Sequence, residues 1–446
     1  VGISYNITNF SNSLLISNDA GTGTLSSASN NTGLGHQAFN NLTSGDDNTA
    51  MGTNSMFANT TGSDNTGVGL SSLNANTTGD NNTAVGSGAL AANTTANANI
   101  AIGSDALNDN TTGALNVAVG TYALDTNTTA ERNTAIGYAA MDANTEGQYN
   151  TAVGANALDA NTTANNSVSI GYNSLTTNTT GSANTAVGTE ALKDNTTGTN
   201  NVAVGESALA NNTTASENTA VGQNALLTST TAGSNVSVGH DSMRLTTTGA
   251  GNTAVGYDAL RSNTTGGNQV AIGINALYGN TTGSYQVAIG RNALQASDGV
   301  DKNIAIGYNT LAAVSSGNNN IAMGYVAGDA ITTGSGNTVI GSSAGGAITT
   351  ASNNTIVGSD AGKNATTGLV DSVLVGFQAG SSGSMAAYTV GVGYNALYSN
   401  TGNENTAVGY NAMFANTSGV RNVALGLQAL DANTTASNNT AIGHNA

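Results

Sequence analysis

The sequence predicts an all-β protein: an elongated parallel β-roll or β-solenoid of about 25 coils with a 17-residue period, assembled as a homotrimer. Three observations lead to this prediction. A short unit recurs along nearly the whole chain, β-branched residues alternate inside each unit, and the residue between them is almost always small. A fixed short period indicates stacked units, each of which cannot bury its apolar face alone.

A glycine anchors each unit, in the consensus Asn-Thr-Ala-Val-Gly-Tyr-Asn-Ala-Leu-x-x-Asn-Thr-Thr-Gly-x-x. The anchors run from Gly35 to Gly443 at a spacing of 17 residues, apart from one interval of 18 and one of 16. Variation in the repeat divides the chain into four predicted blocks: an N-terminal degenerate coil or cap (1–30), a regular array (31–324), variant repeats of an Ala-Gly type (325–393) and regular repeats truncated at the C-terminus (394–446).

One unit is long enough for short strands but not for a helix of ordinary length. The alternation in Asn116-Val117-Ala118-Val119 predicts a strand. The anchor glycine and the Asn or Asp two residues later suit a bend with positive φ. The Ala-Leu and Asn-Thr-Thr segments predict a second short extended stretch. Each unit is then one coil, stacked about 4.8 Å from its neighbour.

The residue two places before the anchor lies on the opposite strand face from the β-branched residues. If that face met water, it would be polar. It is instead nearly always Ala, so we expect it to pack closely against another chain. The predicted oligomer interface is Ala84, Ala101, Ala118, Ala135, Ala152, Ala186, Ala203 and Ala220.

A size exchange accompanies this column. Where the residue two before the anchor is large, the residue four after the anchor is Gly, as in Leu374 with Gly380; ordinary coils have the reverse, as in Ala84 with Leu90. Close packing conserves local volume, so the two positions are predicted to fill one space. Ala322 with Gly328 breaks the pattern.

The repeated Asn-Thr-Thr segment has three interpretations. Its Asn side chains can form an internal hydrogen-bonded ladder, or they can be glycosylation acceptors, because Asn-x-Thr is the sequon. Alternatively, one Thr of each coil forms a flat outward row that binds ice. The asparagines concerned are Asn59, Asn76, Asn93, Asn110, Asn127, Asn161, Asn178, Asn195, Asn212, Asn263, Asn280 and Asn433.

Composition excludes several classes of function. The net charge is −17, and no basic run could neutralise phosphates, so neither nucleic acid nor an anionic membrane surface is an expected partner. No apolar run approaches the roughly 20 residues of a membrane span, so membrane insertion is not expected either. The absence of Cys excludes disulfides and thiolate metal sites. No non-repeating cluster of titratable groups indicates an active site, so we expect no catalysis, no cofactor and no bound metal.

Three columns of side chains carry the remaining candidates. His36, His240 and His444 each follow an anchor but lie many coils apart, which disfavours a shared metal. Asp125, Asp142 and Asp159 share a column, although without the calcium-binding nonapeptide motif. The last column is largely Tyr and can either pack between coils or contact a sugar or surface: Tyr138, Tyr172, Tyr257, Tyr308, Tyr325, Tyr394 and Tyr410.

Segments such as Asn116-Val117-Ala118-Val119-Gly120 and Gln286-Val287-Ala288-Ile289-Gly290 resemble the YadA-like head repeats of trimeric autotransporter adhesins. Similar repeats occur in fibre proteins attributed to phages and marine microbes. The resemblance covers about residues 12–446 and implies three chains around one axis with the small residue facing it. The coil here is longer than in the adhesin heads, and residues 1–446 show neither the coiled-coil stalk nor the barrel anchor of those proteins.

The expected function is therefore an extracellular structural or adhesive fibre on a cell surface, an adhesin head or filament shaft. The alternatives are a phage or virus tail-fibre shaft on a virion and an ice-binding β-solenoid. The expected partners are further copies of the chain, as a homotrimer or an end-to-end filament, and a cell-surface or carbohydrate receptor.

Overall fold

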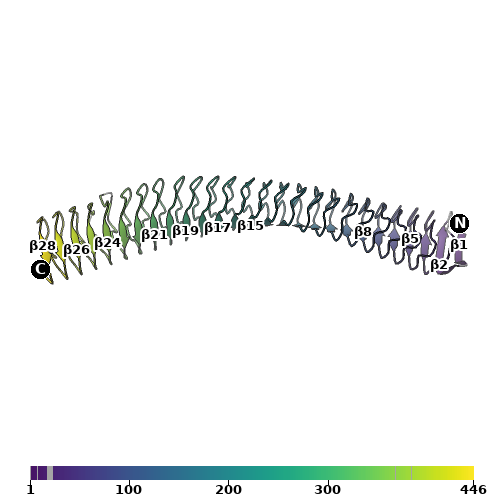
Figure 1. Ribbon diagram of the computed structural model, residues 1–446, viewed down its shortest axis with the longest axis horizontal. Coiled ribbons are helices and arrows are strands. Elements are labelled where there is room, and N and C mark those ends of the chain that lie inside the picture. The colour runs from purple at the N-terminus through teal and green to yellow at the C-terminus, as the bar shows by residue number, and fades with distance from the viewer. Residues whose placement is uncertain (1, 8, 18–23, 367, 383) are drawn as a thin grey trace. The chain divides into compact units, whose positions relative to one another are not determined.

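The computed structural model describes residues 2–7, 9–17, 24–366, 368–382 and 384–446. The chain forms two compact units, Val1–Asn218 (unit 1) and Thr219–Ala446 (unit 2). Both are parallel β-solenoids in which one coil follows the next along the unit, as Figure 1 shows. Among the described residues no helix is long and apolar enough to cross a membrane.

Almost every coil contributes one strand of three residues. In unit 1 the strands are β1 (Gly2–Ile7), β2 (Phe10–Ser17), β3 (Ala28–Ser29), β4 (Thr32–Leu34), β5 (Thr49–Met51), β6 (Thr66–Val68), β7 (Thr83–Val85), β8 (Ile100–Ile102), β9 (Val117–Val119), β10 (Thr134–Ile136), β11 (Thr151–Val153), β12 (Val168–Ile170), β13 (Thr185–Val187) and β14 (Val202–Val204). In unit 2 they are β15 (Thr219–Val221), β16 (Val236–Val238), β17 (Thr253–Val255), β18 (Val270–Ile272), β19 (Val287–Ile289), β20 (Ile304–Ile306), β21 (Ile321–Met323), β22 (Thr338–Ile340), β23 (Thr355–Val357), β24 (Val373–Val375), β25 (Val390–Val392), β26 (Thr406–Val408), β27 (Val423–Leu425) and β28 (Thr440–Ile442).

The strands pair in register, so that equivalent residues of the repeat lie side by side. Ala135 pairs with Ala118 on one side and with Ala152 on the other, each 17 residues away. The predicted all-β class, parallel pairing and 17-residue coil are therefore confirmed. The N-terminus differs, because β1 pairs antiparallel with β2, which in turn pairs parallel with β3 and β4. Residues 18–23 of the predicted degenerate coil lie outside the described residues.

The anchor glycine is required both by its own backbone and by the neighbouring coil. Gly188 has a φ of +135°, and a Cβ added to it would lie 2.6 Å from the carbonyl oxygen of Gly205. Residues with an L side chain rarely adopt that φ. The clashing atom belongs to the backbone of the next coil, so no side-chain rotation can relieve the clash.

The rest of each coil consists of turns, so the predicted second extended stretch is absent from the described coils. Three non-glycine residues per ordinary coil take the left-handed conformation; in one coil they are Ala98 (φ 58°), Asp105 (55°) and Leu107 (53°). Leu107 remains in this conformation because its N–H donates to the Ala123 carbonyl at 3.0 Å and its side chain is fully buried. Burial of a Leu side chain contributes roughly 1.5–3 kcal/mol, which offsets the strain of a left-handed residue.

The size exchange predicted from the sequence occurs inside a single chain. A Cβ added to Gly380 would lie 2.9 Å from Leu374 Cδ1, and one added to Gly345 would lie 3.2 Å from Val339 Cγ1. The exception at Gly328 also has a physical cause. There the space is taken by Ile331, whose Cδ1 would lie 3.0 Å from the added Cβ. The variant repeats are therefore ordinary coils in which the large core side chain comes from a different position of the repeat.

Candidate interaction surfaces

The alanines predicted to contact another chain lie inside their own chain. Ala84, Ala101, Ala118, Ala135, Ala152, Ala186, Ala203 and Ala220 all have an exposed fraction of 0%. A methyl group enclosed by its own coil cannot contact a second chain, so the predicted interface at these residues is wrong. The coil interior is narrow, and the alanine column leaves room there for the buried Leu side chains.

The residues on either side of this column form the outward surface. We call the first and third residues of strands β4–β28 the outer strand face. The first residue is always Thr, Val or Ile, and the third is always Val, Ile, Leu or Met. None of them is buried, and Ile102 and Ile136, for example, are exposed to 41% and 40%. An outward surface without one charge, Asn, Gln or Ser is unusual for a parallel β-structure in water.

The turn asparagines form an internal ladder. Asn127 is fully buried; its Nδ2 donates to Asn110 Oδ1 at 2.8 Å and to the Ala130 carbonyl at 3.2 Å, and its Oδ1 accepts from Asn144 Nδ2 at 3.0 Å. Asn59, Asn76, Asn93, Asn110, Asn161, Asn178, Asn195, Asn212, Asn263 and Asn280 are likewise fully buried. Their side-chain nitrogens are not accessible for glycosylation. Asn433 is half-buried but donates to Asn416 Oδ1 and the Ala436 carbonyl.

A second ladder, which sequence reasoning missed, runs through the Asn that opens each repeat. Asn116 Nδ2 donates to the Ala130 carbonyl at 2.9 Å, and its Oδ1 accepts from the Asn133 backbone N–H at 2.9 Å. Both ladders therefore meet at one carbonyl in each such coil. The near-invariance of this Asn in the repeat was the signal that could have revealed it.

The histidines and tyrosines of the column after the anchor lie at the surface. Tyr138, Tyr172, Tyr257, Tyr308, Tyr325, Tyr394 and Tyr410 are exposed to between 39% and 59%. Where aromatic residues occupy successive coils, their rings stack: His240 lies 5.3 Å from Tyr257, and Tyr394 lies 5.3 Å from Phe377 and 5.1 Å from Tyr410. His36 and His444 occupy equivalent positions in other coils. Over the part of the chain that the structure describes, no group of three His, Cys, Asp or Glu is placed to hold a metal ion.

The aspartate column, Asp125, Asp142 and Asp159, buries carboxylates at a cost in free energy. Burial and, to a smaller extent, the nearby carboxylates Asp142, Asp109 and Asp105 together raise the pKa of Asp125 to about 6. Burial also raises the pKa of Asp142 and of Asp159. Asp125 Oδ1 is buried without a hydrogen-bond partner.

The aspartate column should make stability depend on pH. Because the folded-state pKa of Asp125 lies above the unfolded value near 3.8, the folded state binds the proton more tightly. Stability should therefore rise as the pH falls from about 6 towards 4, and Asp125→Asn should stabilise the chain at pH 7 but not below pH 4. Denaturant unfolding across this pH range measures the effect. Asp194→Asn controls for the loss of one negative charge, and an equal gain in both variants would contradict the prediction.

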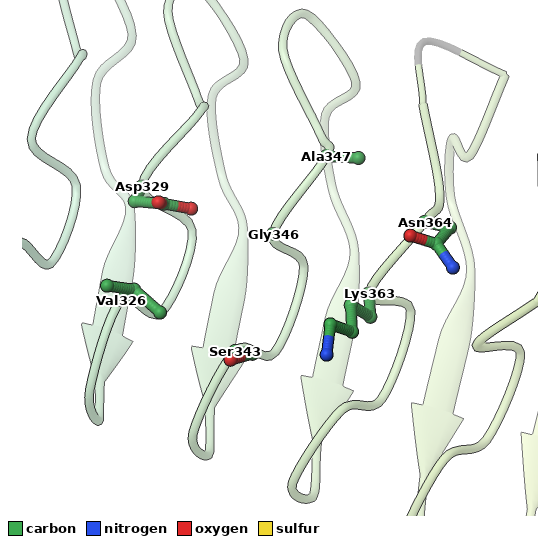
Figure 2. A pocket seen from close by; sticks show the side chains of 7 residues that line it. All are labelled: Val326, Asp329, Ser343, Gly346, Ala347, Lys363 and Asn364. Carbon is green, nitrogen blue, oxygen red and sulfur yellow. The ribbon is translucent and has the colours of Figure 1, made fainter.

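Two grooves in unit 2 are the candidate ligand sites. The first, of about 390 Å³, is lined by Tyr257, Asp258, Asn275, Tyr278 and Gln295; we call it the tyrosine groove. The second, of about 280 Å³, opens where Gly346 leaves a gap in its column, and Figure 2 shows it between three successive coils. We call it the glycine notch; its lining is Val326, Asp329, Ser343, Gly346, Ala347, Lys363 and Asn364.

A charged network joins two residues that line the tyrosine groove, Asp258 and Tyr278, to side chains of the neighbouring coil. Arg261 Nε lies 3.3 Å from Asp258 Oδ1 and 3.6 Å from Asp241 Oδ2, and Arg244 Nη1 lies 3.4 Å from the same Asp241 oxygen. Arg261 Nη1 also donates to the Tyr278 hydroxyl at 2.8 Å, with its guanidinium 5.8 Å from the ring centre. This network connects three consecutive coils and holds the groove's side chains in place.

Comparison with known proteins assigns no relative. No protein-family model matches the chain, and no curated protein matches it at a significant level.

Proposed function

We propose that this chain is an extracellular structural and adhesive fibre, an adhesin head or filament shaft on a cell or the shaft of a tail fibre on a virion, whose copies pack through the outer strand face. The observation that carries the proposal is the absence of charge from that face throughout strands β4–β28. A repeating solenoid with a recognition surface needs no catalytic centre, and we assign none.

The area of the outer strand face supports the proposal that another molecule covers it. A three-residue strand is about 10 Å long and neighbouring strands are about 4.8 Å apart, so the eleven strands β4–β14 present roughly 500 Å² and the fourteen strands β15–β28 roughly 700 Å². Contiguous apolar patches on soluble monomers rarely exceed roughly 300–600 Å². Thr holds the first position in 13 of these 25 strands, so the continuous apolar part of the face is the row of Val, Ile, Leu and Met at the third position.

A second copy of the chain is the occupant that fits best. Its own outer face repeats with the same strand spacing, so every coil meets an equivalent coil without loss of register. The net charge of −17 would repel another copy, but the face itself carries no charge and permits close approach. We propose three chains around a common axis, the number implied by the resemblance to trimeric adhesin heads.

Charges placed on the outer strand face should separate the copies. Ile102→Lys with Ile136→Lys would bury two unpaired ammonium groups in the proposed interface, at a cost of several kcal/mol. We expect sedimentation velocity to show a shift towards single chains, with the secondary structure unchanged because both side chains point outward.

The matched control is Thr95→Lys with Thr129→Lys, which adds the same charge at exposed turn positions. It should leave the assembly intact. Equal assembly of both double variants would show that the outer strand face is not the interface.

One observation favours the ice-binding alternative. The second Thr of the Asn-Thr-Thr segment is exposed in successive coils, including Thr61, Thr78, Thr95 and Thr112, whereas the hydroxyl of the first donates to the next coil, as Thr94 does to the Thr111 carbonyl at 3.1 Å. This leaves a regular row of free hydroxyl groups. Thermal hysteresis of the purified chain distinguishes this function, because a fibre without ice affinity shows none.

A further inference from the structure

We propose that the tyrosine groove of unit 2 binds one residue of a neutral saccharide. The inference deepens the adhesive part of the proposed function and rests on it, because it names the chemical class of the receptor.

The groove offers the mixture of donors and acceptors that a polyol requires. The Tyr278 oxygen already accepts a hydrogen bond from Arg261 Nη1 at 2.8 Å, so its own O–H proton is directed elsewhere and can be donated. The amides of Asn275 and Gln295 carry both donors and acceptors. Asp258 Oδ1 is buried 3.3 Å from Arg261 Nε, so this oxygen balances the charge beside the groove, and the Tyr278 hydroxyl and the two amides are the groups left to bind a ligand.

The charge balance of the groove disfavours an anionic ligand. The two cations of the adjoining network, Arg244 and Arg261, are matched by Asp241 and Asp258, with separations of 3.3–3.6 Å. Arg261 is further occupied by the hydroxyl and the ring of Tyr278. No uncompensated positive charge remains among these groups to attract a sulfate, phosphate or sialic acid carboxylate, so the ligand is a neutral one.

The groove is also preorganised and of suitable size. Tyr257 stacks on His240 with the ring planes 10° apart, and Arg261 covers Tyr278, so both rings are held by neighbouring coils. A site held rigid before binding loses little conformational entropy when it is occupied. Its volume of about 390 Å³ falls within the usual range of roughly 300–1,000 Å³ for small-molecule sites.

The glycine notch provides an internal comparison. It lies at the corresponding part of the coil, but its lining has no aromatic ring and includes the apolar residues Val326 and Ala347 (Figure 2). Its Lys363 is paired with Asp360 at 3.1 Å. Saccharide affinity is therefore expected in the tyrosine groove and not in the notch.

The test is titration of the full chain with four neutral sugars: glucose, galactose, mannose and N-acetylglucosamine. Sialic acid serves as the anionic probe. Saturation-transfer NMR and calorimetry detect binding. At least one neutral sugar should bind with a millimolar Kd. Tyr278→Phe removes one hydroxyl and should weaken the binding of that sugar about 5- to 10-fold. Gln295→Ala should weaken it by a similar factor. Tyr398→Phe is the matched control, because Tyr398 occupies the equivalent column and stacks on Phe414 away from the groove; it should leave binding unchanged.

Three results would overturn the proposal. The first is that no neutral sugar binds at concentrations up to about 10 mM, where even weak single-sugar sites are occupied. The others are tighter binding of sialic acid than of any neutral sugar, and an unaltered affinity for the sugar in both groove variants. The mass of the assembly is measured in the same samples. Loss of sugar binding with an intact assembly would count against this site alone, whereas single chains would count against the proposed fibre.

Discussion

Replacing Asn127 with Asp should destabilise the surrounding coils by about 3–5 kcal/mol at pH 7, the range found when a buried charge is left unpaired. The substitution preserves shape but removes the Nδ2 donor. The new carboxylate would then face two acceptors, Asn110 Oδ1 and the Ala130 carbonyl, that Asn127 now satisfies at 2.8 and 3.2 Å. Local hydrogen exchange of β9–β11 and denaturant unfolding both measure the loss.

The effect should depend on pH with a definite sign. Burial and the two facing acceptors would raise the pKa of the introduced carboxyl above its usual value, so the protonated form, which can donate one hydrogen bond, becomes favoured as the pH falls. The destabilisation should therefore decrease on acidification. Asn200→Asp, at an exposed position, is the control and should change stability little. Similar losses from both substitutions would mean that the ladder does not hold the coils together.

Replacing Gly188 with Ala should cost at least about 3 kcal/mol, because two penalties combine at this position. The backbone conformation at φ +135° is one that only glycine adopts readily, and the added methyl would lie 2.6 Å from the Gly205 carbonyl oxygen. Relief requires the two coils to separate and break their strand pairing. We expect increased hydrogen exchange and protease sensitivity confined to β13 and β14.

The neighbouring exchange Thr189→Ala is the control, since Thr189 is exposed and follows the same anchor. It should leave exchange and proteolysis unchanged. Unaltered protection of β13 and β14 in the Gly188 variant would show that the coils are spaced more widely than the structure has them.

The sequence was sufficient to predict the repeat, the parallel pairing and the exchange of volume between Leu374 and Gly380, because each follows from period and size alone. It could not identify the inner strand face. Alternation in Val117-Ala118-Val119 shows that the two strand faces differ, but it does not show which face lies inside the coil, and the prediction that the alanines contact another chain was wrong. The decisive quantity is the width of the coil interior, which already holds a buried Leu and two Asn ladders in an ordinary coil and leaves room only for Ala.

The left-handed leucines and the grooves were beyond prediction for different reasons. A residue with a branched side chain, such as Leu107, rarely takes a positive φ. Its local backbone preference therefore predicts a different conformation from the one that burial of its side chain requires. The tyrosine groove joins Tyr257 to Tyr278, which belong to two different columns of neighbouring coils. Sequence analysis identified one column but could not show that the two meet.

The central claim is that the outer strand face is covered by further copies of the chain. Sedimentation equilibrium of the unmodified chain, at concentrations from nanomolar to micromolar, tests it most directly. With a chain mass of 43.7 kDa, we expect a native mass of at least two whole chains, and of three if the proposed trimer forms. A mass of one chain throughout the micromolar range would contradict it.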